Sequence, residues 1–235
     1  MHLHAPFSLP RRPLALALMG ALTLGLVACG GSDDAPSFKT IELNIAHIND
    51  HHSQLDAFAG NELTLDGVAK QVELGGFARP TAVFKALAGT PNLLKLHAGD
   101  AITGSLYYTF FKGKADAQMM NSICFDAFVP GNHEFDDGDG VFKGFLDALA
   151  DPANGGNCKT PTVSANIVPQ AGTPLAPAGA AAYLQPYTIK KIDGVDVGIV
   201  GVTIAAKTAN SSRPLATTQF QDEAKAAQKA IDDLK

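Results

Sequence analysis

Three short stretches of this sequence combine carboxylate, imidazole and amide side chains. They are Asn49-Asp50-His51-His52, Gly99-Asp100 and Gly131-Asn132-His133-Glu134-Phe135-Asp136, and each follows an apolar run. Carboxylate oxygens and imidazole nitrogens are good ligands for Zn²⁺, Mn²⁺ or iron, and an amide oxygen can complete such a set. Taken together, the three stretches predict a centre that binds divalent metal ions.

Each stretch alone has a simpler explanation. An Asp-x-His sequence, as in Asp50 to His52, is common in polar loops, and the stretch from Gly131 to Asp136 has the composition of a surface turn with an incidental histidine. The recurrence of the same residue types after three successive apolar runs favours the metal centre over three unrelated loops.

The elements that must position these side chains form a strand–helix–strand series. Apolar runs predict strands at Ile41–Ile48, Asn92–His97 and Phe125–Val129, with helices at Phe77–Ala88 and Ala115–Ile123 between them. Such an order predicts an α/β fold with a parallel sheet. Because ligands of open α/β sheets bind beyond the carboxyl ends of the strands, the three stretches are expected at one edge.

The remaining chain is less informative. Val141 to Leu149 repeats apolar residues at helical spacing, and Asn61–Glu73 is interpreted as a loop. Tyr187–Ile192 and Val195–Val202 predict a hairpin, because Asp193-Gly194 between them suits a type I′ turn.

Two further histidines lie within predicted strands. We expect His47 to have a hydrogen-bonded role in the core. His97 is expected to face the core or the wall of the site, with direct metal binding as the alternative.

The first 28 residues have the pattern of an export signal. Arg11 and Arg12 precede the uncharged apolar run Pro13–Ala28, and the run ends in Leu26-Val27-Ala28-Cys29, which resembles the lipobox of bacterial lipoproteins. We therefore expect cleavage before Cys29, lipidation of Cys29, a flexible tether over residues 29–40, and a location in the periplasm or cell envelope. An ordinary secretory signal with a chance cysteine is the alternative.

Charge and cysteine content narrow the function classes. The net charge is −5, and removal of residues 1–28 leaves 16 basic against 23 acidic residues, or −7. An acidic chain without a basic run argues against nucleic-acid binding.

Cys124 and Cys158 are the cysteines left after Cys29, and we predict that they form a disulfide, because disulfides persist in exported proteins.

The chain resembles the calcineurin-like metallophosphoesterases and, within them, the bacterial 5′-nucleotidase family. The resemblance extends over about Ile41 to Lys235 and rests on the three polar stretches together with Ser164-Ala165-Asn166 and Tyr187–Thr203. It implies a layered α/β sandwich and a two-metal phosphoric monoester hydrolase that cleaves phosphate from nucleotides with metal-activated water. The family also contains UDP-sugar hydrolases and cyclic-nucleotide phosphodiesterases, which are alternatives.

The resemblance also implies roles for the ligand residues. Asp50 and His52 would bind the first of two divalent metal ions, Asp100 would bridge both ions, and Asn132 would bind the second. The ligand set admits Zn, Mn or Fe.

The catalytic pair implied by the resemblance is His133 and Asp136. His133 would stabilise the phosphoryl oxygens or assist the leaving group, and Asp136 would orient its ring through a hydrogen bond. The alternative for Asp136 is an N-cap of the helix at Val141–Leu149.

The departure from the family concerns the later ligands. The family completes its metal sites with two later His and a Gln, whereas no His follows His133 here, and the family's C-terminal nucleotide-binding domain has no counterpart. We therefore expect residues 41–235 to be the N-terminal part of the catalytic domain, feebly active or inactive by itself. A non-catalytic, metal-binding surface lipoprotein is the hypothesis from another class.

Overall fold

The computed structural model describes residues 40–235. In chain order the elements are β1 (Asn44–Ile48), β2 (Ala57–Leu65), β3 (Val68–Gly75), α1 (Ala78–Ala86), β4 (Leu93–His97), α2 (Leu106–Phe111), α3 (Lys114–Asn121), β5 (Ala127–Phe128), α4 (Gly138–Ala150), β6 (Ile167–Pro169), β7 (Tyr187–Ile192), β8 (Val195–Val200), α5 (Ala205–Ser211), β9 (Thr218–Phe220) and α6 (Glu223–Asp233). The predicted signal peptide and Cys29 lie outside the described residues.

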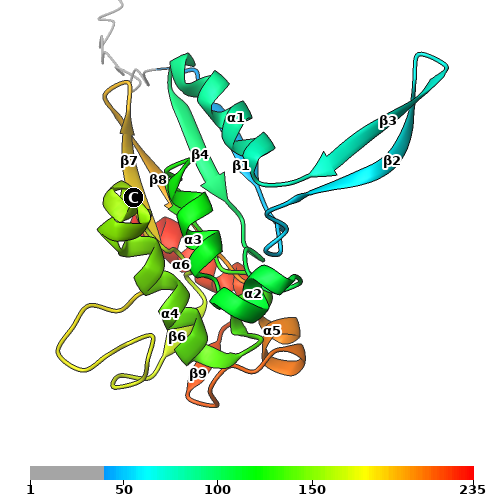
Figure 1. The fold of residues 1–235 in the computed structure, drawn as a ribbon. Helices are drawn as coiled ribbons and strands as arrows, with labels where there is room; N and C mark the ends of the chain where they lie inside the picture. Colours follow the sequence, from blue (N-terminus) through cyan, green and yellow to red (C-terminus); the bar gives the residue numbers. More distant parts are fainter. Residues whose placement is uncertain (1–39) are drawn as a thin grey trace, which may run out of the picture. The chain divides into compact units, whose positions relative to one another are not determined.

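The central sheet is parallel, with the strand order β1-β4-β5; Figure 1 shows β1 and β4 of this sheet. His97 pairs with Ile48 on one side and with Phe128 on the other, so the three strands end level with one another. Isolated bridges extend the pairing from Phe128 to Thr162 and from Val163 to Gln185. The α/β class is confirmed, and the three predicted strands are present in shorter form.

Two apolar clusters cover the sheet. The larger joins α1, α3 and α4 to residues after β4, and α3 lies beside α4 (Figure 1). Within α4, Phe142, Phe145 and Leu149 are buried at helical spacing, as the amphipathic pattern predicts. The smaller cluster packs β4 and β5 against Ile192 and Ile199 of the β7–β8 hairpin. The turn of that hairpin is confirmed, since Asp193 and Gly194 have φ of 48° and 78°.

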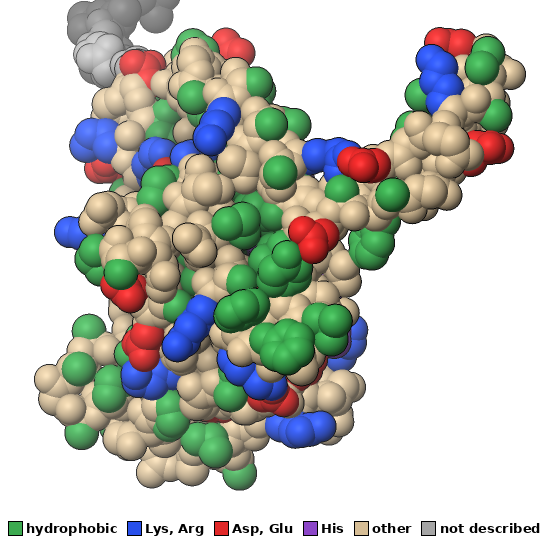
Figure 2. Space-filling model, viewed as in Figure 1, with side chains coloured by type: hydrophobic (Ala, Val, Ile, Leu, Met, Phe, Trp, Pro, Cys, Tyr) green, Lys and Arg blue, Asp and Glu red, His purple; other side chains and the backbone are tan. Residues whose placement is uncertain are grey.

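The expectation of a loop at Asn61–Glu73 is wrong, because this segment lies in the antiparallel hairpin of β2 and β3. Leu65 pairs with Val68 across Asp66-Gly67, and these two turn residues have φ of 53° and 78°, the positive values that an Asp-Gly hairpin turn requires. The hairpin projects from the sheet and helices (Figure 1) and carries exposed apolar side chains (Figure 2).

Histidines in the strands divide between surface and core. His47 is exposed, so the expected core role is wrong, because odd-numbered positions of β1 face away from the helices. His97 is buried, with 1% of its surface exposed.

Within the described residues, no helix is both long and apolar enough to cross a lipid bilayer.

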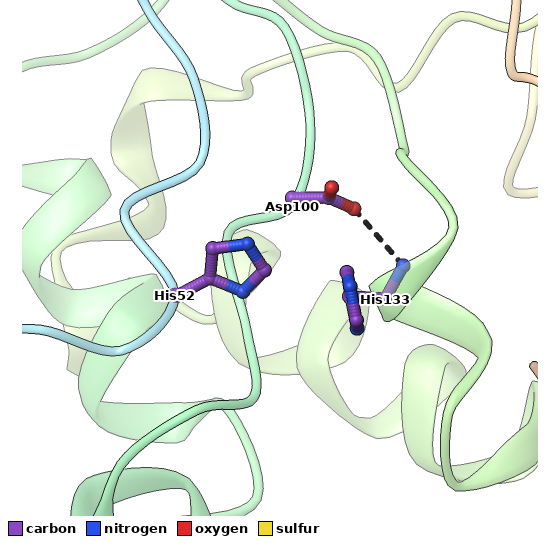
Figure 3. A group of neighbouring side chains, drawn as sticks. All are labelled: His52, Asp100 and His133. Atoms are coloured by element: carbon purple, nitrogen blue, oxygen red, sulfur yellow. Dashed lines mark hydrogen bonds between the residues drawn. The ribbon is translucent and has the colours of Figure 1, made fainter.

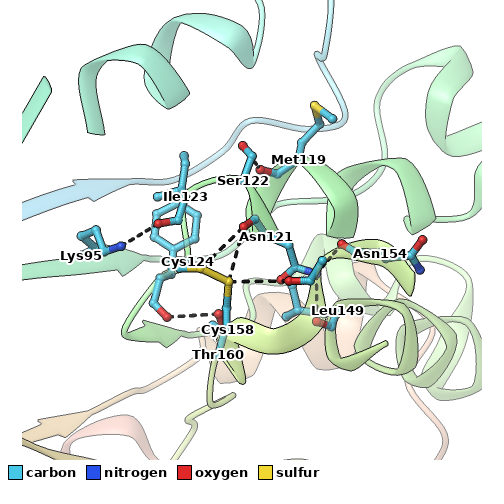
Figure 4. The surroundings of a disulfide bond; sticks show 12 residues. Lys95, Met119, Asn121, Ser122, Ile123, Cys124, Leu149, Asn154, Cys158 and Thr160 are labelled. Carbon is cyan, nitrogen blue, oxygen red and sulfur yellow. Dashed lines mark hydrogen bonds between the residues drawn. A yellow bond between two sulfur atoms is a disulfide. The ribbon is translucent and has the colours of Figure 1, made fainter. Parts of the chain in front are cut away.

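Cys124 and Cys158 are joined by a disulfide with a Cα–Cα distance of 5.1 Å (Figure 4). The bond ties the loop before β5 to the segment after α4, next to the Asn121 carbonyl. It therefore closes a loop that contains the whole stretch from Gly131 to Asp136.

Candidate metal centre

The three polar stretches meet at the carboxyl edge of the β1-β4-β5 sheet, as the parallel order predicts. Backbone pairing continues past the strand ends and joins the first two loops. The Asp50 N–H donates to the Gly99 carbonyl at 2.9 Å, and the His52 N–H donates to the Asp100 carbonyl at 3.1 Å. These backbone hydrogen bonds therefore join the loops after β1 and β4. They bring Asp50 and His52 of the first loop next to Asp100 of the second.

Two glycines allow the second and third loops to touch. A Cβ on Gly99 would lie 2.5 Å from the Gly131 nitrogen, and a Cβ on Gly131 would lie 2.2 Å from Oδ1 of Asp100. Gly99 also has a φ of +93°, which side chains rarely adopt. The space that a methyl group would fill is instead taken by the Asp100 carboxylate.

Within residues 40–235, His52, Asp100 and His133 form a group that could hold a metal ion (Figure 3). One ligand atom from each residue lies within 4.8 Å of the others, and the rings of His52 and His133 meet edge to face with centroids 4.8 Å apart. The Asp100 Oδ1 also accepts the His133 N–H at 2.9 Å. His52 and Asp100 are predicted ligands, and an imidazole with a carboxylate is a donor set that fits a divalent transition metal, while His133 lies beside them as the predicted catalytic residue.

Two predicted ligands lie around this group. Asp50 Oδ1 is 3.6 Å from Nε2 of His52, and the Asp50 side chain is about half exposed. Asn132 is buried and directly precedes His133 at the start of a 3-10 turn. The structure thus places both residues next to members of the group.

The predicted catalytic pair is in contact. Nδ1 of His133 and Oδ2 of Asp136 are 2.6 Å apart, so the carboxylate accepts the Nδ1 proton and Nε2 carries the lone pair. Oδ1 of Asp136 accepts a hydrogen bond from Ser212 at 3.0 Å. The residue before α4 is Asp137, and it makes no side-chain cap, so the N-cap alternative for Asp136 has no support.

Glu134 binds the second and third loops together, and this agrees with the structural role that the sequence favours for it. Its buried carboxylate accepts the N–H groups of Asp100 at 3.0 Å, Ala101 at 2.7 Å and Gly131 at 2.6 Å. Burial and the nearby Asp100 carboxylate raise the pKa of Glu134 to about 7, although these backbone donors favour the charged form. Its position three residues after Gly131 was visible in the sequence, but its backbone partners were not.

Comparison with known proteins agrees with this geometry. The description of the calcineurin-like phosphoesterase family fits residues 43–198. The NAD 5′-nucleotidase of Haemophilus influenzae is 40% identical over 205 residues, covering 86% of this chain and 31% of that protein. A probable 5′-nucleotidase of Treponema pallidum is 37% identical over 227 residues, covering 96% of this chain and 35% of that protein.

Solved structures give the same result. The structure of Haemophilus influenzae NAD nucleotidase matches with a TM-score of 0.72 and 39% identity, covering 83% of this chain and 36% of that one. The 5′-nucleotidase precursor of Thermus thermophilus matches with a TM-score of 0.69 and 35% identity, covering 82% of this chain and 34% of that one. The chain thus spans about a third of the length of the relatives it matches. It belongs to the calcineurin-like phosphoesterase family.

Proposed function

We propose that this chain carries the N-terminal part of a two-metal phosphohydrolase that removes phosphate from nucleotides. The observation that carries the proposal is the convergence of His52, Asp100 and His133 from three loops at one sheet edge. The relatives support the substrate class, since two of them are named as an NAD 5′-nucleotidase and a probable 5′-nucleotidase.

The residues at this edge fit two divalent ions, Zn, Mn or Fe, because they supply imidazole, carboxylate and amide donors. Asp50 and His52 would hold the first ion, Asp100 both ions, and Asn132 the second. Bound in this way, the ions would neutralise charge on the phosphoryl oxygens and activate water.

His133 acts on the substrate in this proposal. Because Asp136 accepts its Nδ1 proton, the ring is fixed in one orientation and Nε2 can take up a proton. A protonated Nε2 can then donate to a phosphoryl oxygen or to the leaving oxygen. The Ser212 hydroxyl lies 3.0 Å from the other Asp136 oxygen, and this contact favours the same orientation of the carboxylate.

Export and lipid anchoring at Cys29 are part of the same proposal. They are supported by the sequence of residues 1–29 alone, and they would imply a location in the periplasm or cell envelope. Labelling of cells with a radioactive fatty acid would test the anchor, since a Cys29→Ser variant should lose the label.

The experiment that tests the reaction is metal-dependent release of phosphate from AMP by the full-length protein, with NAD, a UDP-sugar and a cyclic nucleotide as parallel substrates. We expect Asp100→Ala and His133→Ala to lower the rate by at least about 10²-fold, the cost of one lost transition-state contact. His47→Ala, on the exposed side of β1, is the control. Unchanged rates in the first two variants would remove the site assignment.

A further inference from the structure

The loop after β1 has an unusual backbone. Asp50, His52 and Ser53 have φ of 54°, 47° and 53°, so three residues with side chains adopt the left-handed region within four positions. Residues with side chains are strained in this region, and such a conformation persists only where the surroundings determine it. Some structure must therefore hold this loop in the conformation that presents Asp50 and His52.

His51 points away from the metal centre. Its side chain is 9% exposed, compared with 55% for Asp50 and 28% for His52. It meets the ring of Phe77 edge to face at 4.9 Å and the ring of His97 at 5.1 Å. The side chain between the two predicted ligands is thus an anchor in the core.

A chain of hydrogen bonds runs from β4 to α3 through His51. The Gly99 N–H donates to Nδ1 of His97 at 3.2 Å, so the proton of His97 is on Nε2. This Nε2–H donates to Nδ1 of His51 at 2.9 Å, and Nε2–H of His51 donates to Oδ1 of Asp116 at 3.2 Å. One backbone donor at Gly99 therefore fixes both imidazole tautomers.

Asp116 also holds the far end of the loop. Its second oxygen accepts a hydrogen bond from the Ser53 hydroxyl at 3.0 Å, and both side chains are fully buried. His97 packs against Phe125 and Phe128, and burial lowers its pKa well below the usual value, which keeps the ring neutral. We call His97, His51 and Asp116, with Ser53, the His–His–Asp chain.

We propose that the His–His–Asp chain is the positioning device of the metal centre: it holds the strained loop so that Asp50 and His52 face Asp100. The inference rests on the proposed function, since it concerns the same site. It assigns His51, His97 and Asp116 as positioning residues that act through the backbone. None of them is assigned as a metal ligand.

The test separates the hydrogen bond of His51 with His97 from its hydrogen bond with Asp116. His51→Phe removes both hydrogen bonds. His51→Asn keeps an acceptor in place of Nδ1 for His97, and His51→Gln keeps a donor in place of Nε2 for Asp116. His47→Phe, on the exposed side of β1, is the matched control. Each variant is made in the full chain, and its midpoint of unfolding is measured alongside.

Two readouts follow: Mn²⁺ affinity by calorimetric titration, and hydrogen exchange at the amides of His52 and Ser53 in the metal-free protein. We expect His51→Phe to weaken Mn²⁺ binding and speed exchange at these amides by at least about tenfold. The Asn and Gln variants should recover part of both effects, and His47→Phe should change neither.

The inference is overturned if His51→Phe lowers only the unfolding midpoint and leaves both readouts unchanged. If His51→Phe fails to fold, the same result for the Asn and Gln variants overturns it. Failure of the unaltered protein to bind Mn²⁺ would overturn the proposed metal centre. The exchange measurement would still decide whether the His–His–Asp chain holds the loop.

Discussion

The carboxyl edge of the β1-β4-β5 sheet, where the three polar stretches meet, and the β2–β3 hairpin have similar local backbone features. They are stabilised by different contacts. Both contain glycines and left-handed residues at the ends of strands, such as Gly99 in one and Gly67 in the other. The loops at the sheet edge bond to one another and to buried groups far along the chain, including Glu134. The hairpin pairs with itself and projects into solvent (Figures 1 and 2).

The difference shows where this fold can hold strained backbone. A two-stranded hairpin in water is marginally stable, so it tolerates change and opens easily. At the sheet edge, side chains from several elements stabilise the backbone conformation of the loops. A substitution in one loop is therefore expected to change the conformation of all three. Four predictions test this contrast, from the largest expected effect to the smallest.

The disulfide gives the largest effect, because it closes a loop that contains the third polar stretch, from Gly131 to Asp136, and leaves the hairpin outside. Replacing Cys124 and Cys158 together by Ser should lower the free energy of unfolding by about 4 kcal/mol on the chain-entropy model for a loop of 34 residues. Denaturant unfolding of oxidised and variant protein measures the change. A loss below about 1 kcal/mol would contradict the idea that the site depends on this cross-link.

A pair of matched glycine substitutions compares the two regions directly. Gly99→Ala and Gly67→Ala both place a side chain at positive φ, +93° and +78°, but only at Gly99 would the new methyl group meet backbone. We expect Gly99→Ala to cost about 2–4 kcal/mol from strain and overpacking together, and Gly67→Ala about 1 kcal/mol. Thermal unfolding of both variants measures the costs. Equal costs would show that the contact with Gly131 can relax.

The pH dependence of stability tests the Glu134 clamp in metal-free protein. The pKa of Glu134 is about 7 in the folded chain against an ordinary 4.5, so the folded state binds the extra proton between these values. Stability from this group is therefore full below pH 4.5 and is lost as pH rises through 7. Between pH 5 and 7 the unaltered protein should lose about 2 kcal/mol more than Glu134→Gln. Parallel slopes for both proteins would rule out the raised pKa.

The smallest effect is expected in the hairpin. Leu63→Thr exchanges one exposed apolar side chain for a β-branched polar one, so global stability should change by less than about 0.5 kcal/mol. Ile102→Thr, in the fully buried segment after Asp100, is the contrasting variant and should cost several times more. Urea midpoints of the two variants provide the comparison, and a large effect of Leu63→Thr would mean that the hairpin packs against something.

Sequence patterns predicted the parts of this molecule that depend on neighbours in the chain. The strand ends, the α4 stripe and the contact of His133 with Asp136 follow from local spacing. The partners of His51, and those of Glu134 in the loop after β4, could not be predicted, because they lie 33 to 65 residues away and only the folded chain brings them together. The hairpin was missed for another reason: Asp66-Gly67 carried its turn signal, but the flanking pattern mixed polar and apolar residues.

Ser212 stabilises the third polar stretch from a position much later in the chain, so its contacts can form only after that later segment has been synthesised. The single proton of its hydroxyl is shared between the Asn132 carbonyl at 2.8 Å and Asp136 at 3.0 Å, across 80 and 76 residues of chain. At a synthesis rate of about 5–20 residues per second, roughly 4–16 s separate the emergence of Asn132 from that of Ser212. During that interval the β1-β4-β5 edge can form while Asp136 still lacks its anchor. Asp136 therefore gains this anchor only after the chain has extended 76 residues beyond it.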